Sequence, residues 1–513
     1  MSREQLIWAQ AIFTTIAVFI WWAFDPNSWS NSVLSYIIDK YLRWRYPVNS
    51  VNGRSQIPTR PYKFPDGGGS TKFLDGETVS GDWEKKYGPI YRIWTGLVPE
   101  IVLTRPDDVK TIYKDSDKHF KVNSANAGWV LGALLGDGVG LLNGSHWKRV
   151  HSVVAPPFGQ KATAYVGVVT SRVERHFAEF EDRCAQQGMT RLLQLRATED
   201  LSSFPFWILK DIVYGELPEA MNQELTELID LRNEIWSHTF KGGWSMFSLN
   251  RIFYPTLRRQ LHEFEHRWEA FNDEAYAHIL AQGTTSLPIV SLHRSINEGR
   301  VKRSEVLHSI SEGLFTNVDV TMGTFAWLAL LLALHPEIQT ELREEIAQAR
   351  ARGTPEAWEQ YIASHTTLLA GCVVENGRLR PIANYTYPQY LPEDRAVAGY
   401  VVPRGTYFIV DTNALNRRDP AWGADGDEFR PHRYMEASVT EYRYRLWRFG
   451  FGPRQCLAQA LADTMMKCLT VYLIEKYRIS VPEALAGGKE DWKTRRPDTW
   501  FSMAQNPVVC ERI

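Results

Sequence analysis

Cysteine is scarce in this sequence, with only five among 513 residues. The five are scattered, and no two of them form the C-x-x-C pairs that zinc sites use; they are Cys184, Cys372, Cys456, Cys468 and Cys510. Their number and spacing do not fit the disulfide framework of a small secreted domain either. We therefore expect the main domain to lie in a reducing compartment.

The sequence also lacks a surplus of charge of either sign. Its 58 Lys and Arg residues are balanced by 59 Asp and Glu residues, which leaves a net charge of −1. Proteins that bind nucleic acids carry strongly basic surfaces, so this balance argues against a nucleic-acid partner. With 44% hydrophobic and 12% aromatic residues, the chain can form a substantial core, in several domains or in one large helical domain.

One long apolar run, Leu6 to Phe24, stands near the start of the chain and predicts a membrane anchor. Nineteen residues at ~1.5 Å rise just span the apolar core of a bilayer. The alternative is a cleaved signal peptide, but bulky aromatic residues stand where its small-residue cleavage site should be. Basic residues follow the run, whereas Arg3 alone precedes it. The positive-inside rule then places the body of the protein in the cytosol.

The segment from residue 27 to 69 is predicted to connect this anchor (residues 1–26) to a body that comprises residues 70–513. Asn31 to Tyr46 has the pattern of a short amphipathic helix on a membrane surface. Pro47 to Gly69 is rich in proline and glycine, and we interpret it as a hinge.

The stretch Phe449 to Ala458 carries the strongest chemical signal in the chain. It places Cys456 after glycines at 450 and 452 and directly before a helical pattern of apolar residues. Unpaired backbone N–H groups at a helix N-terminus favour an anion, so we expect the thiolate form of Cys456 to be stabilised. The alternative is a buried structural cysteine after a turn.

This stretch resembles the cysteine loop of the cytochrome P450 family, F-x-x-G-x-R-x-C-x-G. Phe449, Gly452, Arg454 and Cys456 match the motif, and Ala458 stands in place of its last glycine. The resemblance implies that Cys456 is the axial thiolate ligand of a haem b iron. It also implies that Arg454 pairs with a haem propionate and that Phe449 belongs to the cofactor site.

Two further residues are candidates for the cofactor site. Trp147 and His151 are four residues apart and would share one face of a helix. The family places a Trp and a basic residue here against a haem propionate, although an ordinary surface helix remains the alternative.

The pattern from Ser304 to Leu334 predicts one helix of ~45 Å, which resembles the central helix of the family. Asp319 then takes the position of the family's acidic residue, and Thr321 that of its second threonine. Asn317 replaces a glycine, and Val320 replaces the threonine that is tied to proton delivery. A valine cannot donate a hydrogen bond. We therefore name Asp319, Thr321 and Asn317 as candidate catalytic residues.

Glu375 and Arg378 resemble the family's E-x-x-R helix, and Phe429 to Tyr434 resembles its F-x-P-x-R-F segment. The resemblance implies that Arg433 joins these two residues in a structural network. A surface ion pair is the alternative. Four arginines near Cys456 form a candidate docking patch for an acidic flavoprotein, with solvated loop charge as the alternative: Arg443, Arg445, Arg448 and Arg454.

Local patterns predict several smaller elements. Ile90 to Trp94 and Glu100 to Leu103 are predicted strands, and Asp107 to Tyr113 is a predicted helix. Lys121 to His146 is predicted to be a mobile loop, which in the resembled family lies over the substrate. Residues 500–502 and 508–509 are predicted to pair as a terminal hairpin.

Together these features predict a mainly helical cytochrome P450 fold with small β-sheets, preceded by a single transmembrane helix. The expected activity is a haem-thiolate monooxygenase of the endoplasmic reticulum membrane, with its catalytic domain in the cytosol. An NADPH-dependent flavoprotein reductase would supply electrons, and the substrate would be a small apolar molecule. The pattern resembles fungal secondary-metabolite enzymes, which leaves terpenoids, polyketides and cyclic dipeptides as substrate classes.

Two other functions stay open. The changes at Asn317 and Val320 are compatible with a haem enzyme of the same fold that couples, dehydrates or rearranges its substrate without inserting oxygen. A haem-binding sensor or carrier is a third hypothesis. The anchor, the basic patch and the large distal loops argue against it.

Overall fold

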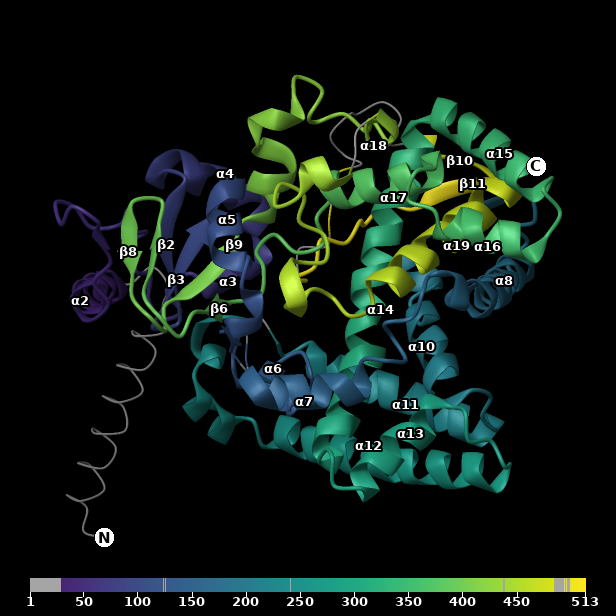
Figure 1. Cartoon of the computed structure of the whole chain (residues 1–513), viewed down its shortest axis with the longest axis horizontal. Coiled ribbons are helices and arrows are strands. Elements are labelled where there is room, and N and C mark those ends of the chain that lie inside the picture. Colours follow the sequence, from purple (N-terminus) through teal and green to yellow (C-terminus); the bar gives the residue numbers. More distant parts are fainter. Residues whose placement is uncertain are drawn as a thin grey trace, which may run out of the picture.

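The computed structural model describes residues 29–483, except 123, 125, 240, 437 and 438, together with 493, 495 and 499–513. The predicted anchor, residues 1–26, lies outside the described residues. The described chain is mainly helical with three small sheets, as the sequence predicts (Figure 1).

The first half of the chain contains most of the shorter helices. They are α2 (Trp29–Arg45), α3 (Gly69–Leu74), α4 (Gly76–Tyr87), α5 (Pro106–Tyr113), α6 (Trp129–Leu135), α7 (Gly144–Val154), α8 (Thr163–Gln186), α9 (Ala197–Asp200), α10 (Phe204–Tyr214) and α11 (Glu219–Trp236). The second half contains α12 (Pro255–Ala281), α13 (Pro288–Asn297), α14 (Arg303–Leu334), α15 (Pro336–Arg350), α16 (Pro355–Ala363), α17 (Leu368–Leu379), α18 (Arg433–Glu436) and α19 (Gln459–Lys476).

The strands form two sheets on the N-terminal side and one on the C-terminal side of the molecule (Figure 1). The five-stranded sheet has the order β2 (Ile90–Thr95), β3 (Val98–Leu103), β9 (Tyr407–Val410), β6 (Gln389–Tyr390) and β4 (Phe120–Lys121). The second sheet joins β1 (Asn49–Ser50), β8 (Tyr400–Val402) and β7 (Arg395–Val397), and the third joins β10 (Tyr477–Ser480), β11 (Val508–Arg512) and β5 (Leu192–Leu195).

Helix α14 crosses the middle of the molecule and packs against α10, α17 and α19 (Figure 1). A helix that is apolar on nearly all sides is typical of a protein interior. Within the described chain, α14 is the one helix long and apolar enough to cross a membrane, and 67% of its most apolar window is buried inside the protein. We therefore assign it to the core, and the prediction of a central helix over residues 304–334 is confirmed.

Two local predictions are wrong. The stretch from Lys121 to His146 contains helix α6, because Leu131, Leu134 and Leu135 are buried in the core. The terminal hairpin does not form, because β11 pairs with β10 on one side and with β5 on the other. The predicted strands around Gly96 and the helix after Pro106 are confirmed as β2, β3 and α5.

A buried ionic network links α17 to the segment before the cysteine loop. Glu375 is fully buried, and its carboxylate accepts hydrogen bonds from Arg378 at 2.7 and 2.8 Å and from Arg433 at 3.0 Å. The Tyr434 hydroxyl donates to it at 3.0 Å and the backbone N–H of Arg430 at 3.1 Å. The predicted network is confirmed, and the tyrosine that replaces the family's phenylalanine adds a donor to it.

We predict that Glu375→Ala destabilises the protein by ~3–5 kcal/mol, because two buried arginines lose their counter-ion. The measurement is the free energy of unfolding in urea. Glu344→Ala is the control, since Glu344 is exposed on α15 and its loss should change stability by less than ~0.5 kcal/mol. Equal effects of the two substitutions would contradict a structural role for Glu375.

Candidate functional site

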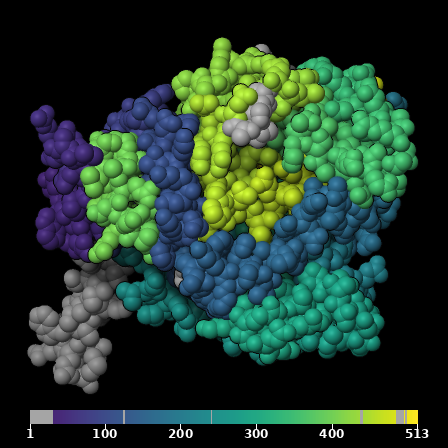
Figure 2. All heavy atoms as spheres, viewed as in Figure 1, coloured from purple at the N-terminus to yellow at the C-terminus, as the bar shows by residue number. Residues whose placement is uncertain are grey.

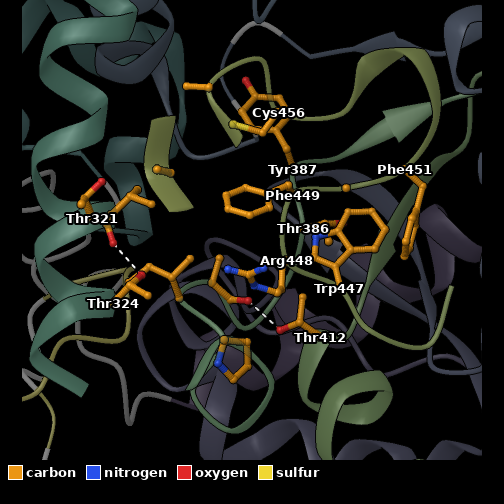
Figure 3. Close-up of a pocket in the computed structure, with 18 of the residues that line it drawn as sticks. Thr321, Thr324, Thr386, Tyr387, Thr412, Trp447, Arg448, Phe449, Phe451 and Cys456 are labelled. Atoms are coloured by element: carbon orange, nitrogen blue, oxygen red, sulfur yellow. Dashed lines mark hydrogen bonds between the residues drawn. The ribbon is translucent and has the colours of Figure 1, made fainter. Parts of the chain in front are cut away.

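Two cavities with volumes of about 380 and 320 Å³ lie between α14 and the cysteine loop. They share six lining residues: Lys121, Asn317, Val320, Arg454, Cys456 and Ala458. Phe449 and Cys456 stand across the first cavity from Thr321 and Thr324 of α14 (Figure 3). In the space-filling view, the yellow C-terminal part of the chain comes to the surface between the blue segments that include α5 and α7 and the green helices α15 to α17 (Figure 2).

Two glycines determine the backbone conformation of the cysteine loop. Gly450 and Gly452 adopt φ values of +80° and +74°, which side chains disfavour. A Cβ at position 452 would lie 2.3 Å from the Ser116 hydroxyl, and that hydroxyl donates to the carbonyl of Phe451 at 3.0 Å. The Cys456 N–H donates to the carbonyl of Phe449 at 2.7 Å. These contacts leave Cys456 three residues before α19, close to the helix start that the sequence predicts.

Cys456 is the only exposed cysteine among the described residues, and the other four are buried. Because Cys456 lines both cavities, it is exposed to the interior space rather than to the outer surface. Burial raises the pKa of the Cys456 thiol, and the N–H of Ala458 and the charge of Lys121 lower it by less. The backbone N–H at the helix start thus favours the thiolate, as the sequence predicts, but burial outweighs this effect. A coordinated metal ion deprotonates a thiol outright.

Two half-buried cations, Lys121 and Arg454, stand at the cavity beside Cys456. Arg454 donates to the carbonyls of Gly140 at 3.2 Å and Leu142 at 2.8 Å, and its guanidinium lies 4.7 Å from the Trp147 ring. Burial lowers the pKa of Arg454 to about 10. Burial and the charge of Arg454 lower the pKa of Lys121 to about 8. Sequence reasoning missed Lys121, because a single lysine in a loop carries no recognisable signal.

Trp147 and His151 share one face of α7, as their spacing predicts, with ring centroids 4.7 Å apart. Both line the second cavity. Burial and the nearby charge of Arg454 lower the pKa of His151, so its imidazole is neutral at pH 7.

The cavity residues fit haem. A sulfur that can ligate a metal faces a space with mostly apolar walls. Lys121 and Arg454 line the same space and have lowered pKa values, so a bound anion would stabilise their charged forms. Haem combines a flat apolar ring, a central iron and two carboxylates. Arg454 and Lys121, with Trp147 beside them, would hold the carboxylates.

The cavity face of α14 carries several polar groups, some of which bond within the helix. The Thr316 hydroxyl, at the second cavity, is buried and has no hydrogen-bond partner in the described structure. The Thr321 hydroxyl donates to Asn317 Oδ1 at 2.5 Å, and the Thr324 hydroxyl donates to the carbonyl of Val320 at 2.7 Å. Asn317 Nδ2 is buried and has no hydrogen-bond acceptor in the described structure. Asn317 and Thr321 thus lie next to each other at the first cavity, and the apolar side chain of Val320 lines the cavity beside them.

Asp319 is not part of this cavity face, since it does not line either cavity in the described part of the chain. Instead, its charge acts on Arg232 of α11, where burial lowers the guanidinium pKa to about 10 and Asp319 and Glu312 partly offset that shift. Glu312, which lies two helical turns before Asp319, does line the second cavity. No local pattern distinguishes Glu312 from the other acidic residues of the chain.

The predicted basic docking patch does not form. Arg448 donates to Asp463 at 2.6 Å, Arg445 pairs with Asp419 at 3.2 Å, and Arg454 points into the cavity. Of the four arginines, only Arg443 has an exposed side chain. Local sequence shows where charges gather but not which of them are already paired.

Residues 78–494 match the family model Cytochrome P450. The chain is 42% identical to the cytochrome P450 monooxygenase roqR of Penicillium rubens, over 100% of both chains. It is 37% identical to the cytochrome P450 monooxygenase aclC of Aspergillus oryzae, over 92% of this chain and 95% of the relative. It is 34% identical to the cytochrome P450 monooxygenase gliC of Aspergillus fumigatus, over 93% of each chain. With the helical fold, the cavity and its cysteine, these matches show that the chain belongs to the cytochrome P450 family of haem-thiolate monooxygenases.

Proposed function

We propose that this P450 monooxygenase oxidises a small apolar substrate in fungal secondary metabolism, with Cys456 as the thiolate ligand of its haem iron. The observation that carries the proposal is the position of Cys456, a single cavity-facing cysteine opposite α14 and beside two half-buried cations. The three fungal relatives support a biosynthetic role.

Bound haem supplies activation of O₂ by its iron, with two electrons that we propose come from NADPH through a flavoprotein reductase. One oxygen atom enters the substrate and the other leaves as water, which requires two protons. The chain must therefore hold the substrate, exclude bulk water and deliver those protons.

The cavity walls support an apolar substrate. Phe73, Leu131, Trp500, Phe501 and Met503 pack into one cluster, and Val320, Ile382 and Tyr387 lie against it. Trp500 of this cluster lines the first cavity, together with the three residues that lie against the cluster. Terpenoids, polyketides and cyclic dipeptides are all compatible with such a pocket.

We propose that protons reach the site through the Thr321 hydroxyl and water, with Asn317 holding that hydroxyl in place. A hydroxyl both accepts and donates a proton, whereas a valine side chain does neither. Asp319, beside Arg232, would supply protons from the α11 side of the helix.

A second candidate is oxidative coupling, dehydration or rearrangement without oxygen insertion. It is favoured by Val320 and by the Thr321 hydroxyl, which donates to Asn317 and not to the cavity. Such a reaction needs fewer protons at the distal side.

We also propose a single-pass association with the endoplasmic reticulum membrane, through the anchor and through an apolar surface on the body. Helix α2 (purple in Figure 2) exposes Tyr36, Ile37 and Trp44, with exposed fractions of 65%, 56% and 75%. The turn at residues 248–253 exposes Leu249 and Phe253 by 78% and 77%.

These two apolar groups are linked through Phe64. The N–H of Phe64 donates to the hydroxyl of Ser35 on α2 at 2.9 Å, and its ring lies 5.4 Å from Trp244, close to the turn. One membrane surface can therefore contact both groups.

We predict that Cys456→Ser abolishes the long-wavelength Soret band of the reduced CO complex, because an alcohol cannot provide a thiolate ligand. Cys184→Ser, at a buried cysteine, should retain the band. An unchanged spectrum in Cys456→Ser would show that another group ligates the iron.

We predict that Thr321→Val lowers product formed per NADPH at least tenfold, since positioned proton transfer typically contributes ~10²–10⁴-fold. Asp319→Asn should slow turnover at least tenfold if it feeds the same route. Thr324→Val is the matched control, because that hydroxyl bonds to the helix backbone. If Thr321→Val and Asp319→Asn both remain within twofold of the wild type, with no ¹⁸O from ¹⁸O₂ in the product, the second candidate holds.

We predict that the chain without residues 1–26 still binds phospholipid vesicles, and that Ile37→Ser with Trp44→Ser weakens this binding severalfold by removing apolar contact area. Vesicle flotation measures the bound fraction. Leu192→Ser is the control, because Leu192 is 57% exposed on β5, in the C-terminal sheet. An equal loss in that control would rule out a specific docking face.

A further inference from the structure

Residues 136–143, between α6 and α7, form a strap that is fastened to α14. Three backbone N–H groups of the strap donate to side chains of α14. Asp137 donates to His308 Nδ1 at 2.9 Å, Val139 to the Ser309 hydroxyl at 3.0 Å and Gly140 to Glu312 Oε2 at 2.9 Å. The strap thus follows about one turn of the central helix.

The strap fits around the Glu312 carboxylate only because it has no side chains there. A Cβ at Gly140 would lie 1.8 Å from Glu312 Oε1, and a Cβ at Gly138 would lie 2.6 Å from Oε2. No real Cβ contact is that short, so a substitution at Gly140 must displace the carboxylate or the strap.

The other side of the strap holds Arg454. The carbonyls of Gly140 and Leu142 accept from its Nη2, and Asn143 Oδ1 accepts from its Nη1 at 3.4 Å. The same Asn143 oxygen accepts from the backbone N–H of Lys121 at 2.8 Å. The backbone of Gly140 therefore connects the two side chains directly, because its N–H donates to Glu312 and its carbonyl accepts from Arg454.

Glu312 is not simply the counter-ion of these cations. It forms no ion pair with Lys121, Arg454 or any other cation of the described residues, and its direct bond is to a neutral backbone N–H. Buried groups of this kind are kept for the geometry they impose as well as for their charge.

We propose that Glu312 is a positioning residue for the cofactor: it fixes the strap, and the strap aims Arg454 at the haem carboxylates. The proposal rests on the proposed function, in that the Cys456 cavity holds the haem. The family motifs do not include Glu312, and its role follows from the Gly140 contact on one side and the Arg454 contacts on the other.

The test is the rate at which the holoenzyme loses haem to an excess of apomyoglobin. Glu312→Leu removes the acceptor for the Gly140 N–H, and the methyl group of Gly140→Ala collides with the Glu312 carboxylate. Each variant should lose haem about tenfold faster than the wild type, as expected for one lost hydrogen bond in a buried site. Glu312→Gln keeps an acceptor for Gly140 and should stay within twofold of the wild type. Gly167→Ala, on α8 with no atom within 4 Å of the added Cβ, is the matched control for an added methyl group.

A double variant separates positioning from general damage. Glu312→Ala makes room for the methyl group of Gly140→Ala, so the combined variant should lose haem no faster than the faster single variant, because both act on one contact. Hydrogen exchange of the amides of residues 137–140 in the holoenzyme should accelerate in Glu312→Leu and not in Glu312→Gln. Unfolding midpoints establish that each variant is folded.

Three outcomes would overturn the proposal. Glu312→Leu could keep the wild-type rate of haem loss although its strap amides exchange faster. Glu312→Gln could lose haem as fast as Glu312→Leu, which would assign the effect to charge. The effects of Glu312→Ala and Gly140→Ala could also add fully in the double variant. Each of these leaves the proposed function intact, whereas an unchanged CO spectrum in Cys456→Ser contradicts the proposed function and not the strap.

Discussion

The carboxylate of Glu375 lies in the interior, where an ionised group without partners would be very costly. Its partner Arg378 also donates to the carbonyls of Asn416, Gly426 and Glu428, which shapes the long connection that follows β9. The Asn416 amide in turn bonds to the carbonyl of Gly377 and to both backbone groups of Trp447. The position of the cysteine loop, which begins two residues after Trp447, therefore depends on the charge of Glu375, a residue that does not itself line either cavity.

The sequence predicts those elements of the structure that are determined by the pattern of neighbouring residues. The central helix, β2, β3 and α5 follow from the periodicity of neighbouring residues, and Glu375 and Arg378 meet because they lie three apart on one helix. The contacts of the strap and of Lys121 could not be predicted, because they join residues about 170 and about 20 positions apart in the sequence. Such contacts depend on the path of the chain between the two residues, which local patterns do not determine. The stretch around α6 was mispredicted because its glycines suggest a loop, whereas burial of Leu131 and Leu134 stabilises a helix.

Desolvation acts on four titratable groups of the cavities in the direction that opposes their charge. It raises the pKa of Cys456 and Glu312 and lowers that of Lys121 and Arg454. A ligand that brings a cation to the sulfur and two anions to the cations would reverse the shifts of Cys456, Lys121 and Arg454 at once. Haem does both, and the electrostatics of the protein therefore favour binding of the complete cofactor over binding of the ring alone.

The distal wall of α14 has its own constraint, because the hydroxyl groups of Thr321 and Thr324 donate to the helix itself. The Thr324 hydroxyl bonds to a backbone carbonyl and cannot leave it without exposing a buried acceptor. The Thr321 hydroxyl bonds to a side-chain amide, which has a second orientation. If the amide of Asn317 turns over, its Nδ2 donates to the Thr321 oxygen, and the hydroxyl proton is then directed to the cavity. In this orientation Nδ2 also gains the acceptor that it lacks in the first. In that orientation, asparagine at 317 would compensate for the exchange of threonine for valine at 320, since the lost donor would be replaced by a hydroxyl that a neighbouring amide controls.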